Sequence, residues 1–263
     1  MTKSQNLMEG KRGLILGVAN DHSIAWGIAR TLAAQKAEIA LTFQDDNFGK
    51  RVRPLAQSID APLVLQCDVA DQDSIDAVFT AVERQWGGLD FVVHAIAFSD
   101  RAELNGRFVD TTRENFARSL DISCYSFTAI ARNAAALMHD GGSILTLTYA
   151  GSRRVMPNYN VMGVAKAALE ASMRYLAADL GPCNIRVNAL SAGPMRTLAG
   201  AAISGSRFVY KWQAENAPLR RGVTLDEIGG AALYLLSDLG RGTTGEIIHV
   251  DAGYNVVGMI AND

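Results

Sequence analysis

The sequence predicts an α/β fold in which one doubly wound parallel sheet carries helices on both faces. Along its 263 residues, short apolar runs alternate with longer amphipathic stretches, and regular alternation of this kind is typical of βαβ units. The apolar runs are continuous rather than broken at every second residue, which indicates strands covered on both sides. The chain has no internal repeat and no Pro/Ser-rich linker, so residues 1–263 are expected to form a single domain.

The expected elements follow from these runs in chain order. Runs such as GLILG, EIALTF and GSILTLT have the length and composition of buried strands. Strands are expected at residues 13–17, 38–43, 62–66, 89–96, 142–148, 185–189 and 246–251. The stretches between them have the length and apolar spacing of helices, expected at about 23–36, 50–59, 72–86, 113–138, 158–180 and 225–237. A loop-rich segment follows the sixth strand.

Charge and cysteine usage exclude several kinds of partner. The formal net charge is −2 with both signs interspersed, so no footprint for nucleic acid is expected. No apolar run approaches the length of a membrane span, and the polar residues 1–10 do not resemble a secretion signal. Cys67, Cys124 and Cys183 are odd in number and widely spaced; they indicate a reducing compartment and neither a metal site nor a disulfide framework. The expected location is the cytoplasm.

The first strand runs directly into a turn that is typical of nucleotide binding. Gly17 ends the strand, Ser23 stands where a helix cap should fall, and Gly27 lies inside the following helix. Glycines at such a turn let the backbone approach a pyrophosphate, which then sits on the helix N-terminus. The spacing departs from GxGxxG, and a capping Ser also fits an ordinary helix start. The location at the first βα crossing favours a Rossmann-type dinucleotide site.

The ends of the second and third strands bear on which dinucleotide is bound. Gln44 occupies the position where an acidic residue commonly holds the adenosine ribose. Asp45 and Asp46 follow, and no Lys or Arg is adjacent to receive a 2′-phosphate, so NADH is expected rather than NADPH. Asp68 follows the third strand, where contact with adenine and a helix-capping role fit its position equally well. His94, on the fourth strand, is expected to be structural.

Tyr159 and Lys166 form the strongest chemical constellation in the sequence. They lie seven residues apart, which is two helical turns and one helix face. An ammonium near a phenol is expected to lower the phenol pKa, so that the Tyr can donate a hydrogen bond or proton to an oxyanion. A Tyr and a Lys on a solvated helix face would be commonplace, but the location after the fifth strand of a nucleotide-binding fold favours the chemical interpretation.

These residues resemble a known family. Short-chain dehydrogenases carry Tyr-x3-Lys and a catalytic Ser at the end of the fifth strand. In this chain Met162 stands four residues before Lys166, and Tyr149 stands where that Ser would fall. Both replacements, with the Tyr-x6-Lys spacing, resemble the bacterial enoyl-[acyl-carrier-protein] reductases. Segments similar to that family's motifs lie at residues 157–163, 186–197 and 245–251, so the resemblance covers almost the whole chain.

The resemblance implies NADH-dependent reduction of the trans-2 double bond of an enoyl-acyl carrier protein in fatty acid elongation. Hydride would reach the β carbon, and Tyr159 with Lys166 would stabilise the resulting enolate. Tyr149 would border the substrate as the third catalytic residue. The resemblance also implies a cofactor site lined by Gly17, Ser23, Ile24, Gln44, Asp68, Val69, Ile96, Lys166, Met195, Arg196, Thr197, Leu198 and Ala199.

The same resemblance implies a substrate side and an assembly. Ser99 would contact the acyl substrate, and residues at about 195–215 would form a substrate-binding loop. Within it, residues 197–206 are small and apolar with two glycines, as in a loop that orders over an acyl chain; an ordinary helix start is the alternative. The family forms homotetramers, and the apolar residues 254–260 would be buried in a subunit contact.

Two alternatives remain, one another enzyme of the same fold and one a protein of a different functional class. A ketone or β-ketoacyl reductase of the same fold is disfavoured by Met162 and Tyr149, which occupy the two positions where such an enzyme needs Tyr and Ser. A dinucleotide-sensing protein without catalysis is disfavoured because Tyr159 and Lys166 are retained together. Turnover of an enoyl thioester distinguishes the expected function from both alternatives.

Overall fold

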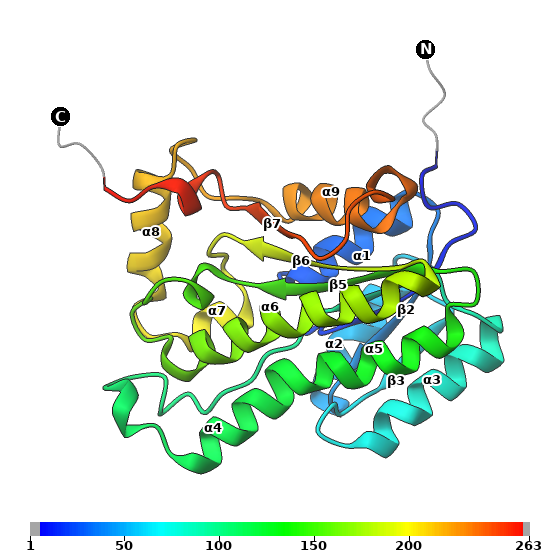
Figure 1. The fold of residues 1–263 in the computed structure, drawn as a ribbon, viewed down its shortest axis with the longest axis horizontal. Helices are drawn as coiled ribbons and strands as arrows, with labels where there is room; N and C mark the ends of the chain where they lie inside the picture. Colours follow the sequence, from blue (N-terminus) through cyan, green and yellow to red (C-terminus); the bar gives the residue numbers. More distant parts are fainter. Residues whose placement is uncertain (1–5, 260–263) are drawn as a thin grey trace.

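The computed structural model describes residues 6–259 and contains one seven-stranded sheet (Figure 1). The strand order is β3-β2-β1-β4-β5-β6-β7, and every neighbouring pair is parallel. The strands are β1 (Arg12–Leu16), β2 (Glu38–Phe43), β3 (Leu63–Gln66), β4 (Phe91–His94), β5 (Gly142–Thr148), β6 (Ile185–Ala192) and β7 (Ile247–Val250). The predicted α/β class with a doubly wound parallel sheet is confirmed.

Helices connect the strands and cover both faces of the sheet. They are α1 (Ile24–Ala34), α2 (Asp46–Gln57), α3 (Gln72–Trp86), α4 (Arg113–Leu120), α5 (Ser126–Leu137), α6 (Asn160–Leu180), α7 (Leu198–Ala202), α8 (Ser206–Asn216) and α9 (Leu225–Leu236). One apolar core lies between the sheet and α1, α2 and α9, and a second lies between the sheet and α3, α5 and α6. This two-sided burial explains why the strands are apolar at consecutive positions.

Every strand and helix expected from the sequence is present, with ends shifted by a few residues. Two expectations need correction. The helix expected over 113–138 is interrupted by the π-helical turn η2 (Asp121–Tyr125), which separates α4 from α5. The segment at 195–215, expected as a loop, contains α7 and α8, because Thr197 caps the first of them and Gly205, with φ of 74°, begins the second.

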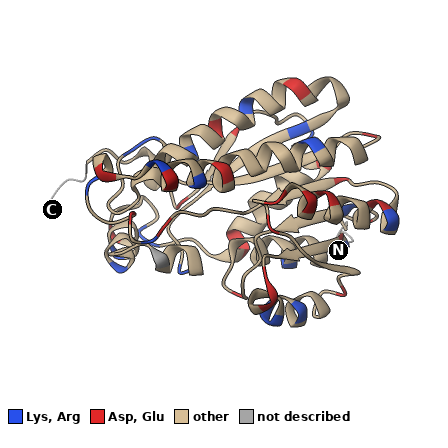
Figure 2. Cartoon of the chain, turned by 90° about the horizontal axis from the view of Figure 1, so that it is seen from below, with Lys and Arg blue, Asp and Glu red and all other residues tan. Residues whose placement is uncertain are grey.

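Charged side chains of both signs lie close together in the structure. Figure 2 shows Lys and Arg mixed with Asp and Glu along the same helices. Within residues 6–259, no helix combines the length and apolar character that crossing a membrane requires, and no cluster of three His, Cys, Asp or Glu side chains is arranged to hold a metal ion. The expectations for residues 1–10 and 254–260 fall in part outside the described range, since residues 1–5 and 260 are not described.

The strand order alone predicts where a ligand crevice lies in this sheet. Successive strands lead away from the centre in both directions, so the order reverses between β1 and β4. In open parallel sheets ligands bind outside the carboxyl ends of the strands at such a switch point. Gly17 follows β1 and Ala95 follows β4 at this point.

Candidate active site

Gly17 lets the chains leaving β1 and β4 touch. Its φ is 99°, in the left-handed region that favours glycine. A Cβ at this position would lie 2.1 Å from the carbonyl oxygen of Ala95, far inside van der Waals contact. Gly17 is half-buried, and its lack of a Cβ lets the backbone after β1 lie directly against the backbone after β4 at the switch point.

Ser23 occupies the N-cap position of α1, but its hydroxyl does not cap that helix. The buried Ser23 Oγ instead accepts hydrogen bonds from the backbone N–H groups of Ala19, at 3.0 Å, and Asn20, at 3.1 Å. The expectation that Ser23 caps the helix is corrected, because the hydroxyl closes the preceding turn. The first turn of α1, which begins at the half-buried Ile24, thus faces the crevice without a side-chain cap, and its dipole favours an anion there.

Gln44 and Asp68 stand at the carboxyl ends of β2 and β3. Gln44 is exposed, and the neighbouring Asp45 accepts hydrogen bonds from two backbone N–H groups as the N-cap of α2. Asp68 Oδ1 accepts from Ala70 N at 3.0 Å, whereas Asp71 is the N-cap of α3. The alternative that Asp68 caps the following helix is therefore wrong.

Tyr159 and Lys166 are both buried, at 8% and 6% exposure, at the carboxyl end of β5. Lys166 Nζ donates to the carbonyl oxygen of Leu147 on β5 at 2.9 Å. Tyr159 lies at the N-terminus of α6, and its ring meets that of Tyr149 edge to face, with centroids 5.1 Å apart. The structure therefore brings Tyr149 and Tyr159 into contact, and it ties Lys166 to the end of the strand that precedes Tyr149.

Two glycines permit this arrangement. A Cβ on Gly151, in the turn that follows Tyr149, would lie 2.3 Å from the Tyr159 ring. A Cβ on Gly163 would lie 2.7 Å from the Gly151 carbonyl oxygen. The first turn of α6 can therefore pack directly on the backbone after β5, and this contact places the two tyrosine rings side by side.

Burial sets the protonation of these groups. It raises the pKa of Tyr159, and to a similar extent that of Tyr149, because an anion is poorly solvated there. The same desolvation lowers the pKa of Lys166 to about 8. The expectation that the ammonium would lower the Tyr159 pKa is wrong, since desolvation, with smaller contributions from Tyr149 and Glu170, raises it. Tyr159 is thus a neutral phenol at pH 7, able to donate to an oxyanion.

Glu170 is a buried residue of this site that sequence reasoning missed. Its Oε1 accepts from Thr148 Oγ1 at 2.7 Å and from Ser152 Oγ at 2.5 Å, and Arg153 pairs with its other oxygen at 3.6 Å. Thr148 and Ser152 flank the turn that carries Tyr149, so the carboxylate holds that turn against α6. The available signal was the Lys-x3-Glu spacing, which places Glu170 one helical turn beyond Lys166.

The remaining candidates lie around these two groups of residues. Val69 and Ile96 are half-buried against the core, as is Met195 after β6. Ser99 Oγ donates to Asn115 Oδ1 at 3.2 Å, so its hydroxyl already has a partner. Thr197 caps α7 through a hydrogen bond to its Oγ1 from Gly200 N, while Arg196, Leu198 and Ala199 are exposed at the start of that helix.

A small apolar cluster separate from the main cores adjoins the tyrosines. Leu104, Tyr159 and Met162 form its centre, and Tyr149, Met156 and Ile203 pack against them. Ile203 follows α7, so the segment after β6 reaches over the tyrosine pair. The arrangement is a neutral phenol and a buried ammonium beneath an apolar wall, which suits an apolar substrate with one oxygen that gains negative charge.

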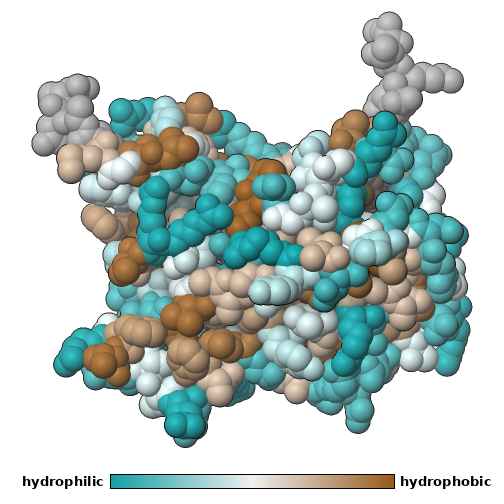
Figure 3. All heavy atoms as spheres, viewed as in Figure 1, coloured by the Kyte–Doolittle hydropathy of each residue, from teal (hydrophilic) through white to brown (hydrophobic). Residues whose placement is uncertain are grey.

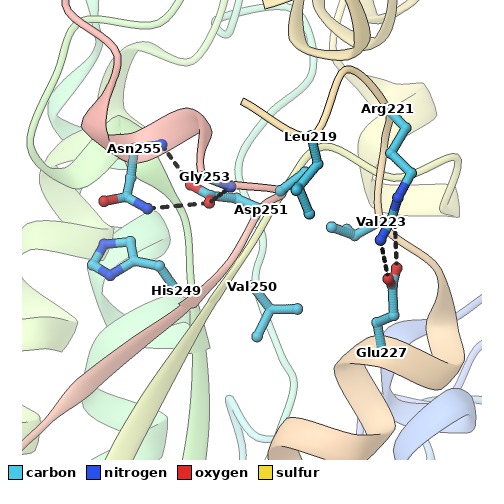
Figure 4. A pocket seen from close by; sticks show the side chains of 10 residues that line it. Leu219, Arg221, Val223, Glu227, His249, Val250, Asp251, Gly253 and Asn255 are labelled. Atoms are coloured by element: carbon cyan, nitrogen blue, oxygen red, sulfur yellow. Dashed lines mark hydrogen bonds and ion pairs between the residues drawn. The ribbon is translucent and has the colours of Figure 1, made fainter. Parts of the chain in front are cut away.

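A separate pocket of about 270 Å³ lies beyond the carboxyl end of β7 (Figure 4). The Arg221–Glu227 ion pair closes one side, and on the other side Asp251 accepts hydrogen bonds from the backbone N–H groups of Gly253 and Asn255. None of the residues expected to be catalytic lines this pocket. Among its polar side chains, Arg221 is paired with Glu227 and Asn255 with Asp251.

Comparison with known proteins identifies the family. Residues 17–255 match the family described as Enoyl-(Acyl carrier protein) reductase. The chain is 65% identical to "Enoyl-[acyl-carrier-protein] reductase [NADH] 2" of Rhizobium meliloti, over 96% of this chain and 94% of that protein. It is 53% identical to "Enoyl-[acyl-carrier-protein] reductase [NADH] FabI" of Rickettsia typhi, over 96% of this chain and 97% of that one.

Solved structures agree. An enoyl-(acyl-carrier-protein) reductase of Anaplasma phagocytophilum in complex with NAD superposes with a TM-score of 0.93 at 60% identity, covering 98% of this chain and 96% of that one. The Bacillus cereus enoyl-acyl carrier protein reductase, with NADP⁺ and indole naphthyridinone, superposes with a TM-score of 0.94 at 48% identity, covering 96% of this chain and 99% of that one. By sequence and by fold, the chain belongs to the enoyl-(acyl carrier protein) reductase family.

Proposed function

We propose that this chain catalyses the NADH-dependent reduction of the trans-2 double bond of an enoyl-acyl carrier protein in fatty acid elongation. The observation that carries the proposal is the contact between Tyr149 and Tyr159 at the carboxyl end of β5, where Lys166 donates to the carbonyl oxygen of Leu147. A ketone reductase would need a Ser and a Tyr where this chain has Tyr149 and Met162.

The roles of the three residues follow from where charge develops. NADH, when bound, would supply the hydride that adds to the β carbon of the enoyl group. Negative charge would then move to the thioester oxygen as an enolate, and a proton taken up at the α carbon would complete the reduction. Tyr159 donates a hydrogen bond to that oxygen, and its raised pKa keeps the proton in place for this role. Lys166 holds the nicotinamide ribose and adds positive charge nearby. Tyr149 packs on Tyr159 and orients the substrate.

The residues at the switch point fit a dinucleotide. Gly17 leaves room for a pyrophosphate, the open start of α1 favours its charge, and Gln44 offers an amide to the ribose. Asp68, Val69 and Ile96 would line the adenine and nicotinamide sides. Ser23, Ile24 and Lys166 would also line the site. The residues after β6 would close it, namely Met195, Arg196, Thr197, Leu198 and Ala199.

The substrate side of the site would use the segment at 195–215, which carries α7 and α8. Ser99 would contact the acyl thioester, and the apolar cluster that contains Leu104 and Met162 would contact the acyl chain. We further propose that residues 1–263 act as one domain and that the partner is acyl carrier protein. Cytoplasmic location is supported by free thiols at Cys67, Cys124 and Cys183.

A homotetramer is part of the proposal and is supported by the surface. Figure 3 shows apolar side chains over the face where Figure 1 places α5 and α6. Large apolar side chains are exposed on α6, at Val164 and Tyr175, and directly before α5, at Tyr125. Contact with another copy would bury them. Near the C-terminus Val256 is also exposed. Sedimentation of a stable monomer would contradict this part of the proposal.

The function is tested by turnover with crotonyl and longer enoyl thioesters, with NADH and NADPH measured side by side. We expect oxidation of NADH with the enoyl thioester, a lower kcat/KM with NADPH, and no turnover of a β-ketoacyl thioester. Turnover of the ketone alone would establish the ketone reductase instead, and binding of NADH without turnover of either substrate would establish a dinucleotide-sensing protein.

Ser23→Ala is expected to weaken NADH binding about tenfold while the fold stays intact. The Ser23 hydroxyl accepts from two N–H groups of the turn beneath the proposed pyrophosphate, and a lost buried hydrogen bond costs about 1–3 kcal/mol. Isothermal titration with NADH measures the effect. Ser58→Ala, which removes an exposed hydroxyl bonded to a helix carbonyl, serves as the control. Equal affinity of the two variants would contradict the proposed place of the pyrophosphate.

A further inference from the structure

A row of buried polar side chains runs along one side of the bent helix formed by α4, η2 and α5. Its members are Asn115, Ser119, Ser123 and Ser126, and the three serines are fully buried. Three of the four bond to the segment that begins at His94 and follows β4. Buried hydroxyls in a helix interior are costly unless they are satisfied, so this row requires an explanation.

Ser123 makes the central contact. Its Oγ accepts from the backbone N–H of Phe98 at 2.9 Å and donates to the carbonyl oxygen of the same residue at 3.0 Å. The Ser123 hydroxyl therefore satisfies both the N–H and the carbonyl group of Phe98, which lies outside the sheet. The same Oγ lies 3.8 Å from Met162 Sδ on α6, so Ser123 stands between the segment after β4 and the helix that carries Lys166.

The π turn underlies the neighbouring contact. Its geometry sends the N–H of Ser126 to the carbonyl of Asp121, five residues back, while the Ser126 hydroxyl donates to the carbonyl oxygen of Ile122 at 2.6 Å. Because that proton is already used, Ser126 Oγ accepts from His94 Nε2 at 2.8 Å. The π turn thus ties the last residue of β4 to the start of α5.

Asn115 holds the far end of the same segment. Its Oδ1 accepts from Asp100 N at 2.9 Å and from Ser99 Oγ at 3.2 Å. The segment is therefore fixed at His94, at Phe98 and at Ser99 to Asp100 by side chains of α5, η2 and α4, respectively. π turns inside α-helices are often found at functional sites, and this one fixes the stretch between Ile96 and Ser99, the proposed nicotinamide and acyl contacts.

We infer that Ser123 is a positioning residue of this enzyme, which sets the backbone between the cofactor and substrate contacts relative to the tyrosine pair. The inference rests on the proposed function, because that function gives Ile96 and Ser99 their roles. Ser123 itself touches neither reactant. Misplacement of reacting groups by about 1 Å costs on the order of a hundredfold in rate, so a small shift at Phe98 is enough to be measured.

The test compares Ser123→Ala with the matched control Ser143→Ala. Ser143 is also a buried serine whose hydroxyl donates to a backbone carbonyl, that of Leu235, at 3.0 Å, but it lies at the opposite end of β5 from Tyr149. Both variants should lose similar thermal stability. Only Ser123→Ala should lower kcat with an enoyl thioester, by about 10- to 100-fold, and it should raise the primary isotope effect with deuterated NADH as hydride transfer becomes limiting.

A second variant covers the case in which Ser123→Ala does not fold. Ser123→Cys keeps the size of the side chain and weakens the hydrogen bonds, and it should give an intermediate loss of kcat. Equal kcat for the Ser123 and Ser143 variants, or a loss confined to stability, would overturn the positioning role while leaving the proposed function intact. If the unaltered chain fails to reduce the enoyl thioester, the proposed function is rejected and this inference with it.

Discussion

Lys166→Met is expected to lower kcat/KM for an enoyl thioester by about two to four orders of magnitude and at the same time to stabilise the unliganded fold. The loss of activity follows from the proposed role of the ammonium, which is to supply positive charge and a ribose contact where the enolate forms. Removal of one such electrostatic group typically costs 10²–10³ in rate. Loss of cofactor orientation adds to that effect.

The gain in stability follows from the burial of Lys166. Desolvation lowers its pKa to about 8 from an ordinary value of 10.5. Between these two pH values the unfolded chain binds more protons than the folded one, so this group's contribution to stability rises with pH across the window. Below pH 8 Lys166 is protonated in both the folded and the unfolded chain, so the folded chain bears the whole cost of burying the charge. The size of the pKa shift puts this cost at roughly 3 kcal/mol. The variant lacks this cost.

Part of that gain is offset, because the Leu147 carbonyl loses the hydrogen bond from Lys166, at about 1–2 kcal/mol. The net increase in the free energy of unfolding at pH 7 should be about 1–2 kcal/mol, and it should shrink as pH rises from 8 to 10.5. Urea denaturation of the unliganded protein measures it. Lys50→Met, at an exposed position, is the control. A less stable Lys166→Met protein at pH 7 would show that the ammonium stabilises the fold.

The second large effect is a loss of folding stability at acidic pH, caused by protonation of His94. Burial, and to a lesser extent the charge of Lys166, lowers the pKa of His94 to about 3 from 6.5. Between these values the unfolded chain binds the proton and the folded chain does not, so stability falls as pH falls below 6.5. Above pH 6.5 this contribution is fully present. Its loss amounts to roughly 1.4 kcal/mol for each pH unit down to about pH 3.

His94→Gln should flatten this acid dependence, because a glutamine amide donates to Ser126 as the imidazole does but does not titrate. Urea denaturation at a series of pH values from 7 to 4 gives the slope. Other groups titrate in the same range, so the slope is compared with that of His22→Gln, whose imidazole is 71% exposed. Equal slopes for the two variants would mean that His94 takes up its proton without unfolding.

The sheet was predictable because two-sided burial leaves a direct mark on the sequence. Strands such as β4 are apolar at consecutive positions, and the helices between them carry regular apolar spacing. The π turn η2 left no such mark, since it changes hydrogen-bond partners by one residue without requiring Gly or Pro. α8 was missed because Gln213 is its only buried residue, so it has no apolar stripe to recognise.

The candidate site was predictable where its chemistry lies within one element. Tyr159 and Lys166 share α6, so their spacing alone brought them together. Glu170 and Ser123 act on partners 18 to 25 residues away in the chain, and only the fold defines those pairs. The raised pKa of Tyr159 could not be predicted from the sequence either, because desolvation depends on what packs around the ring and not on the spacing of Tyr159 and Lys166.

The position of β1 between β2 and β4 also constrains the order of folding. Gly13 pairs with Ile39 in β2, but it also pairs with Phe91 in β4, 78 residues along the chain. During synthesis the first pair forms early, whereas the second waits until more than 90 residues have left the ribosome. Because contacts of high sequence separation slow folding, the edge of β1 that will hold β4 stays open throughout that interval, and closing it is the step that creates the crevice beside Gly17.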